Sequence, residues 1–208
     1  MKTKKSKIIK LIERIKRHKT SFLSTFIFVA VIVFFIIFAY VRIQTINSLA
    51  SDKLDMATKI IASGNIEQGL SIMDDLMNNY KRTPAAYRAM LMKSTYFINQ
   101  KNYEKAEQLL KNFIENAVPE IVKPIGYPLL ISIYDDTGNL EQAITQSKEF
   151  LSKYESNYLA PSVSENLARL YELSGKTEEA KQTYKNIIDK YFGTVYANKA
   201  SDKLKEKE

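Results

Sequence analysis

A repeat of 37 residues is the feature that most constrains the fold of this chain. Four short turn signals begin at Gly64, Lys101, Gly138 and Gly175, and successive turns are 37 residues apart. Counted from the first residue of each turn, a large apolar residue stands four positions earlier. A glutamate stands three positions later and a small residue stands five positions later. These positions hold Ile60, Phe97, Tyr134 and Tyr171; Glu67, Glu104, Glu141 and Glu178; and Gly69, Ala106, Ala143 and Ala180. Several positions that match in fixed register over four units predict a protein built from structural repeats.

The pattern within each unit is typical of two antiparallel helices. A glycine or asparagine turn ends the first helix (helix A), because a residue in the left-handed conformation is needed there. The glutamate lies in the first turn of the second helix (helix B), where its negative charge suits the helix N-terminus. The small residue of helix B allows the two helices to approach closely, and we expect the large residue of helix A to fill the space that remains.

A second feature is an apolar segment without any charged residue, from Thr20 to Val41. Its core, residues 22–41, is long enough as a helix to cross the roughly 30 Å hydrocarbon layer of a bilayer. A buried helix of a soluble domain is one alternative, although globular helices are rarely apolar on every side. A cleaved signal peptide is another, but its apolar region is normally shorter and ends in a small-x-small cleavage site, which residues 39–42 do not provide. We therefore interpret residues 22–41 as an uncleaved signal-anchor.

The net charge of +8 belongs to the first twenty residues. They hold nine Lys or Arg residues and one acid, Glu13, whereas the rest of the chain holds 22 basic and 22 acidic residues. A neutral body argues against a nucleic-acid-binding domain, which needs a basic face on the fold itself. The positive-inside rule instead predicts a basic cytoplasmic tail at residues 1–21 and a domain at residues 42–208 on the extracytoplasmic, or periplasmic, side of the inner membrane. The tail also has the spacing of a short basic amphipathic helix that could lie on anionic lipid, although its role in topology alone explains the charges.

The composition excludes several kinds of chemistry. The chain has no cysteine, and its one histidine, His18, lies in the basic tail, so neither a thiolate site nor a Ser-His-Asp triad can be built. Six glycines and no GxxxxGK[ST] or GxGxxG pattern leave no phosphate-binding loop. We expect a protein that is not an enzyme, with no cofactor, no metal and no small-molecule substrate.

The repeat positions resemble those of the tetratricopeptide repeat (TPR), in which a large residue, a small residue, an aromatic residue and a glycine turn precede an alanine on helix B. The resemblance covers roughly residues 46–208, with departures: the period is 37 instead of 34, no tryptophan begins helix A, and Lys93 and Ile131 stand at two pattern positions. We therefore predict an all-α fold with one N-terminal transmembrane helix, a TPR-like α-solenoid of four helix pairs, and a C-terminal capping helix. The predicted repeats are 46–80, 84–117, 121–154 and 158–191, and the cap is 195–206. The helices of the third repeat are predicted at 124–137 and 140–154, with a delayed start or a kink because Pro128 does not fit a helix interior.

Helical-pair solenoids bind proteins on a concave surface lined mainly by helix A. The resemblance to the TPR pattern places twelve residues toward that surface: Arg88, Leu91, Thr95, Ile98, Asn99, Ser132, Asp135, Asp136, Ser162, Glu165, Arg169 and Glu172. Asp135 and Asp136 with Glu165 and Glu172 also allow a hydrolytic or divalent-cation site. Catalysis by a carboxylic acid needs a dry pocket, however, and an Asp-Asp pair before a glycine turn more simply caps or solvates a helix end.

The order of a basic tail, one span and an external TPR-like domain also resembles the YfgM-type ancillary subunits of the bacterial SecYEG translocon, as does the closing segment 191–204. That resemblance implies a membrane-anchored adaptor that links the translocon to periplasmic chaperones or envelope proteins, with lipid contacts through residues 22–41 and the basic tail. A second hypothesis remains open, in which the repeats self-associate or brace an envelope assembly as a structural subunit that binds no client proteins.

Overall fold

The computed structural model describes residues 19–206, and side chains from Leu23 onward. The predictions for the basic tail therefore lie outside the described residues. Over this range the fold is all-α, which confirms the predicted fold class, and the chain divides into two compact units, one up to Leu49 and one from Ala50 on. The helices are α2 (Lys19–Ala62), α3 (Ile66–Asn79), α4 (Pro84–Asn99), α5 (Tyr103–Asn116), η1 (Glu120–Ile125), α6 (Gly126–Asp136), α7 (Leu140–Lys153), α8 (Ala160–Leu173), α9 (Thr177–Lys190) and α10 (Val195–Lys205).

The first unit consists of the apolar part of α2. Every side chain from Leu23 to Thr45 is exposed, and Phe26 is 71% accessible. An apolar surface of this extent on one helix is not found on a soluble protein without a partner or lipid to cover it. By length and composition the helix can cross a membrane, and it is consistent with a signal-anchor or a signal sequence.

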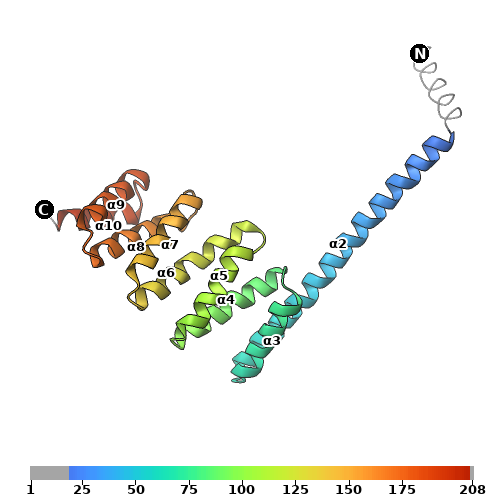
Figure 1. Cartoon of the computed structure of the whole chain (residues 1–208), viewed down its shortest axis with the longest axis horizontal. Helices are drawn as coiled ribbons and strands as arrows, with labels where there is room; N and C mark the ends of the chain where they lie inside the picture. The colour runs from blue at the N-terminus through green and yellow to red at the C-terminus, as the bar shows by residue number, and fades with distance from the viewer. Residues whose placement is uncertain (1–18, 207–208) are drawn as a thin grey trace, which may run out of the picture. The chain divides into compact units, whose positions relative to one another are not determined.

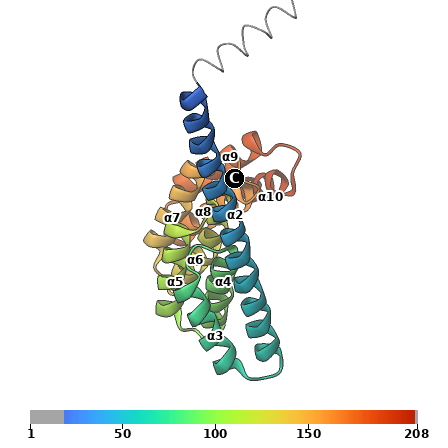
Figure 2. The same cartoon turned by 90° about the vertical axis from the view of Figure 1, so that its right-hand side faces the viewer.

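In the second unit each helix packs on its neighbours in chain order. The helices within a pair and between adjacent pairs are in contact, as α4 is with α5, α5 with α6, and α6 with α7 (Figures 1 and 2). Antiparallel neighbours place all turns within pairs along one edge of this unit and all connections between pairs along the opposite edge. The small residues of the repeat, Gly69, Ala106, Ala143 and Ala180, are all buried.

The turns within pairs have the hydrogen bonds of a Schellman motif. The N–H of Asn139 donates to the carbonyl of Tyr134 at 2.7 Å, and the N–H of Gly138 donates to the carbonyl of Asp135 at 2.9 Å. The same two bonds close the other three turns. In each turn, the large residue four positions before the turn supplies the carbonyl that accepts the first of these bonds. The motif requires a positive φ at the turn residue, and three units use glycine for it while Lys101 adopts φ 56°.

The start of the third pair differs from the others, as its prolines predicted. The 3₁₀ helix η1 occupies residues 120–125, and α6 begins only at Gly126, so Pro128 stands in the first turn of the helix, where its missing N–H breaks no hydrogen bond. Pro84 and Pro161 likewise lie at the first or second position of α4 and α8. The predicted delayed start is therefore confirmed.

The core of the repeats consists of three clusters of buried side chains, which share partly buried residues at their borders. Tyr127 and Phe150, both fully buried, pack edge to face with their ring centroids 5.6 Å apart. Lys93, which departs from the apolar pattern, is buried as well, and its ammonium forms an ion pair with Asp74 of α3 and lies 5.7 Å from the centroid of the Phe97 ring. A buried ammonium is tolerated here because it has a carboxylate and an aromatic face as partners.

Candidate binding groove

The twelve predicted groove residues lie on the three A helices α4, α6 and α8. Five are exposed: Arg88, Thr95, Asn99, Asp136 and Arg169. Seven are half-buried: Leu91, Ile98, Ser132, Asp135, Ser162, Glu165 and Glu172. The hydroxyls of Thr95, Ser132 and Ser162 donate to carbonyls of their own helical turn, so each keeps its acceptor lone pairs for another group.

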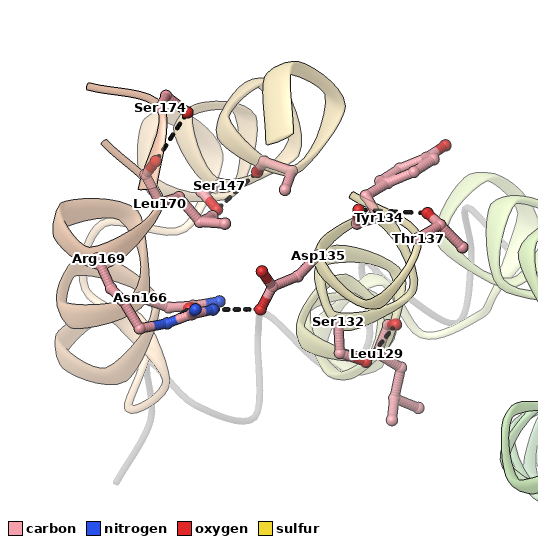
Figure 3. A network of polar contacts seen from close by, with 11 residues as sticks. Leu129, Ser132, Tyr134, Asp135, Thr137, Ser147, Asn166, Arg169, Leu170 and Ser174 are labelled. Atoms are coloured by element: carbon pink, nitrogen blue, oxygen red, sulfur yellow. Dashed lines mark hydrogen bonds and ion pairs between the residues drawn. The ribbon is translucent and has the colours of Figure 1, made fainter. Parts of the chain in front are cut away.

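Two of these residues join adjacent A helices. Figure 3 shows the carboxylate of Asp135 on α6 pointing toward the guanidinium of Arg169 on α8, with which it forms an ion pair. The Nη2 of Arg169 also donates to the Asn166 side-chain oxygen at 2.8 Å, and its Nε donates to the same oxygen at 3.1 Å. The guanidinium is thus held in one orientation on the surface that the A helices share.

The structure collects four predicted residues in one cleft between α8 and α10. The cleft has a volume of about 630 Å³. Its walls include Ser162, Glu165, Arg169 and Glu172 from α8, and they are completed by Asn166, Tyr184, Lys199, Ala200, Asp202 and Lys203. The Nζ of Lys199 lies 3.1 Å from the carboxylate of Glu165, so an ion pair crosses the cleft from α10 to α8.

The only aromatic side chain among the residues that line this cleft is Tyr184 of α9, which is almost completely buried. Burial raises the pKa of its hydroxyl, and the neighbouring carboxylate of Glu172 raises it further by its charge and by hydrogen bonding. The pKa of Lys203 is raised by a hydrogen bond to Glu206 and, more weakly, by the charge of Glu172. At neutral pH the phenol of Tyr184 is therefore neutral.

Sequence reasoning missed the residues of α10, which it treated only as a cap. Lys199, Asp202 and Lys203 stand 37 residues after Ser162, Glu165 and Asn166, so α10 repeats the groove register of α8. Extending the 37-residue period into the cap would have predicted these three residues. The helix packs on α9 through Ala197 and Ala200 and thus takes the place of a further helix A.

The residues of α4 are not part of this cleft. Leu91 and Ile98 pack against the buried cores, so only part of each side chain reaches the surface, while Arg88, Thr95 and Asn99 are not among the residues that line this cleft. Asp136 is exposed and does not line the cleft, and the carboxylate of Asp135 forms an ion pair with Arg169. Among residues 19–206 no group of three histidine or acidic side chains could hold a metal ion.

Chemically, the cleft is a surface of mixed charge. It offers three cationic groups, Arg169, Lys199 and Lys203, and three carboxylates, Glu165, Glu172 and Asp202, along two parallel helix faces. Charged groups that alternate in this way can hydrogen-bond the side chains and the backbone of a polypeptide segment.

Comparison with known proteins agrees with this fold. The family model of the tetratricopeptide repeat-like domain matches residues 17–204, which include the apolar helix and all the repeats. A TPR protein from Parabacteroides merdae is similar with a TM-score of 0.59 and 13% identity, over 73% of this chain and 57% of that one. MamA of strain AMB-1 is similar with a TM-score of 0.52 and 17% identity, over 72% of this chain and 77% of that one. No curated protein matches the chain at a significant level.

The two structural similarities bear on the fold alone, because both identities are low. The family model covers nine-tenths of the chain, and TPR-like families are generally non-catalytic and bind other proteins. The chain therefore belongs to the tetratricopeptide repeat-like domain family.

Proposed function

We propose that this protein is a single-pass membrane adaptor whose TPR-like domain binds segments of other proteins on the extracytoplasmic side of the membrane. The observation that carries the proposal is the cleft between α8 and α10, which joins Ser162, Glu165, Arg169 and Glu172 to three charged residues of the cap helix. The exposed apolar stretch of α2 supplies the membrane anchor.

The chemistry of the cleft supports an extended polypeptide as its ligand. Its charged groups are held in surface ion pairs, as Lys199 is with Glu165 and Lys203 is with Glu206, and an incoming segment would exchange these pairs for its own. Such pairs cost little to break, typically less than about 1 kcal/mol each. Tyr184 adds a largely apolar ring with a polar tip, the type of side chain that interfaces favour.

The proposed orientation rests on the charge distribution of the sequence. Nine basic residues precede the apolar run, and only Arg42 and Lys53 follow within fifteen residues of Val41. This asymmetry supports a cytoplasmic N-terminus and an extracytoplasmic repeat domain. A reporter that is active only outside the cytoplasm, fused after Glu208, tests it, and an inactive reporter would contradict the orientation.

The resemblance to YfgM-type translocon subunits gives the proposal a specific setting. In that setting the adaptor stands beside the Sec translocon and passes emerging envelope proteins to periplasmic chaperones. Its partners are then translocon subunits, chaperones and unfolded or extended envelope proteins.

Site-specific photocrosslinking in membranes tests the function. A benzophenone amino acid is placed at Asp202, which is exposed at the cleft, and in a matched variant at Lys185, which is exposed on α9 away from it. We expect the Asp202 probe to capture several secreted proteins together with translocon subunits, and the Lys185 probe to capture few. Capture of the chain itself, or of one fixed complex only, would refute the adaptor and favour the structural-subunit hypothesis.

A further inference from the structure

Large exposed apolar side chains gather on the connections between helix pairs. These connections, residues 80–83, 117–125, 154–159 and 191–194 with the first residue of α10, form the inter-pair edge of the second unit. On this edge Ile121 is 79% exposed, Tyr158 is 77% exposed and Phe192 is 87% exposed, and Val118 and Val195 are each more than half exposed. Isolated exposed apolar residues are ordinary on soluble proteins, so the position of these five is what matters.

The five residues follow the period of the repeat. Ile121, Tyr158 and Val195 are 37 residues apart, and Val118 and Phe192 are separated by two periods. Equivalent positions of successive units lie side by side along a solenoid. The exposed apolar side chains therefore recur in line along one edge instead of being scattered over the surface.

The opposite edge has a different character. The turns within pairs, residues 63–65, 100–102, 137–139 and 174–176, consist of Gly, Ser, Thr, Asn, Gln and Lys. Two large apolar residues are exposed beside these turns, Ile66 after the first and Leu173 before the last. From the third pair onward, every connection on the inter-pair edge thus exposes large apolar or aromatic side chains.

Two cations complete the inter-pair edge. Lys81 and Arg82, in the connection between α3 and α4, are both exposed, and neither forms an ion pair with a residue that the structure describes. Aromatic and cationic side chains on one surface are the combination found where proteins meet the headgroup layer of a bilayer, because the rings enter the apolar boundary while the cations attract anionic lipid.

The same chain carries a helix that can cross a membrane. Within the second unit, α2 runs from Ala50 to the turn at residues 63–65 and forms the first helix A, so Ala50 lies at the inter-pair edge. The apolar run ends at Val41, nine residues earlier. Nine residues span at most about 30 Å even when fully extended. A bilayer that holds the apolar run is therefore at high effective concentration for the second unit.

We propose that the inter-pair edge rests on the lipid headgroups of the bilayer in which the same chain is anchored, with Ile121, Tyr158 and Phe192 in contact with lipid. The inference rests on the membrane anchor of the proposed function. The binding cleft between α8 and α10 is not part of this edge, and it stays open to protein segments while the edge contacts lipid.

Fluorescence of the full chain in vesicles of phosphatidylethanolamine and phosphatidylglycerol tests the proposal. The chain has no cysteine, so single cysteines can carry an environment-sensitive dye without background labelling. One dye replaces Ser156, an exposed residue of the inter-pair edge, and the matched control replaces Thr177, an exposed residue at the opposite edge. We expect the Ser156 dye to shift to shorter wavelength and to lose intensity to spin-labelled lipid, and the Thr177 dye to do neither.

A triple variant, Ile121→Ser with Tyr158→Ser and Phe192→Ser, removes the apolar groups without touching the core, because all three side chains are exposed. It is expected to abolish the shift and the quenching at Ser156 while its circular dichroism stays unchanged. Equal quenching at Ser156 and Thr177 would overturn the proposal. A shift at Ser156 that occurs in detergent without vesicles and grows with protein concentration would also overturn it, since a second copy would then cover the edge. Alkaline extraction of the same vesicles reports insertion of the apolar helix, so failure of the anchor is read separately from failure of the edge contact.

Discussion

The close approach of the first helix pair can be tested by replacing Gly69 with alanine. Gly69 holds the small-residue position that is alanine in the other three pairs. A Cβ atom added there would lie 2.3 Å from Cγ1 of Ile61 and 2.9 Å from the carbonyl oxygen of Ala57. The second contact is to backbone of a fully buried residue, so a rotamer change cannot relieve it and the two helices must move apart.

The expected magnitude combines two opposing effects. Alanine in place of glycine inside a helix stabilises by about 1 kcal/mol. Overpacking a close helix contact costs about 1–3 kcal/mol. Gly69→Ala is therefore expected to lower the free energy of unfolding by up to about 2 kcal/mol. The matched variant Ala143→Gly, at the same register of the third pair, should also destabilise by about 2 kcal/mol, because it loses a buried methyl group and helix propensity.

Urea unfolding of the full chain in detergent, followed by far-UV circular dichroism, measures both variants. Hydrogen exchange of peptides from residues 54–77 locates the effect of Gly69→Ala, since contacts in a repeat protein are local and the first pair should open more readily than the rest. A stabilisation of Gly69→Ala by about 1 kcal/mol would show that helix propensity acts alone, and it would refute the close contact between α2 and α3.

Three further predictions concern the groove, the turns and the dependence on pH. Arg169→Ala is expected to change the free energy of unfolding by less than about 1 kcal/mol, because the Arg169 side chain that pairs with Asp135 is itself exposed, but to reduce crosslinking from the cleft, and a large loss of stability in urea titration would contradict this. Lys101→Gly should stabilise by roughly 1 kcal/mol in the same titration, because a left-handed lysine is strained by about 1–2 kcal/mol, and an unchanged midpoint would refute that strain. The pKa of Glu149 is lowered by hydrogen bonds from Lys153 and Tyr127, so its contribution to stability is present above the usual value of 4.5 and is lost as pH falls through the lower folded pKa. Unfolding midpoints measured across the acidic range should therefore fall less steeply in Glu149→Gln, and identical profiles would contradict the pairing.

The part of the groove that the sequence predicted rests on the repeat register. Asp135 and Arg169 occupy positions on adjacent A helices that the TPR pattern turns toward one surface, and the ion pair between them follows from that placement. The α10 side of the cleft was not predicted, although the register would have indicated it. A terminal helix can either cover the last pair or continue the surface, and the packing of Ala197 and Ala200 against α9 decides between the two.

Sequence alone determined the helix pairs, their turns and the apolar helix, because each depends on local chemistry: a residue that tolerates positive φ, a charge at a helix N-terminus, or an uncharged run of the length of a bilayer. Only the tertiary structure decided the features that depend on distances between helices. Among these are the absence of room for a Cβ at Gly69, the partner that makes a buried Lys93 tolerable, and the cleft to which α10 contributes one wall. A pattern of spacing fixes which residues share a face, but it does not fix how closely two faces approach, and that separation sets packing, ion pairing and the volume left for a ligand.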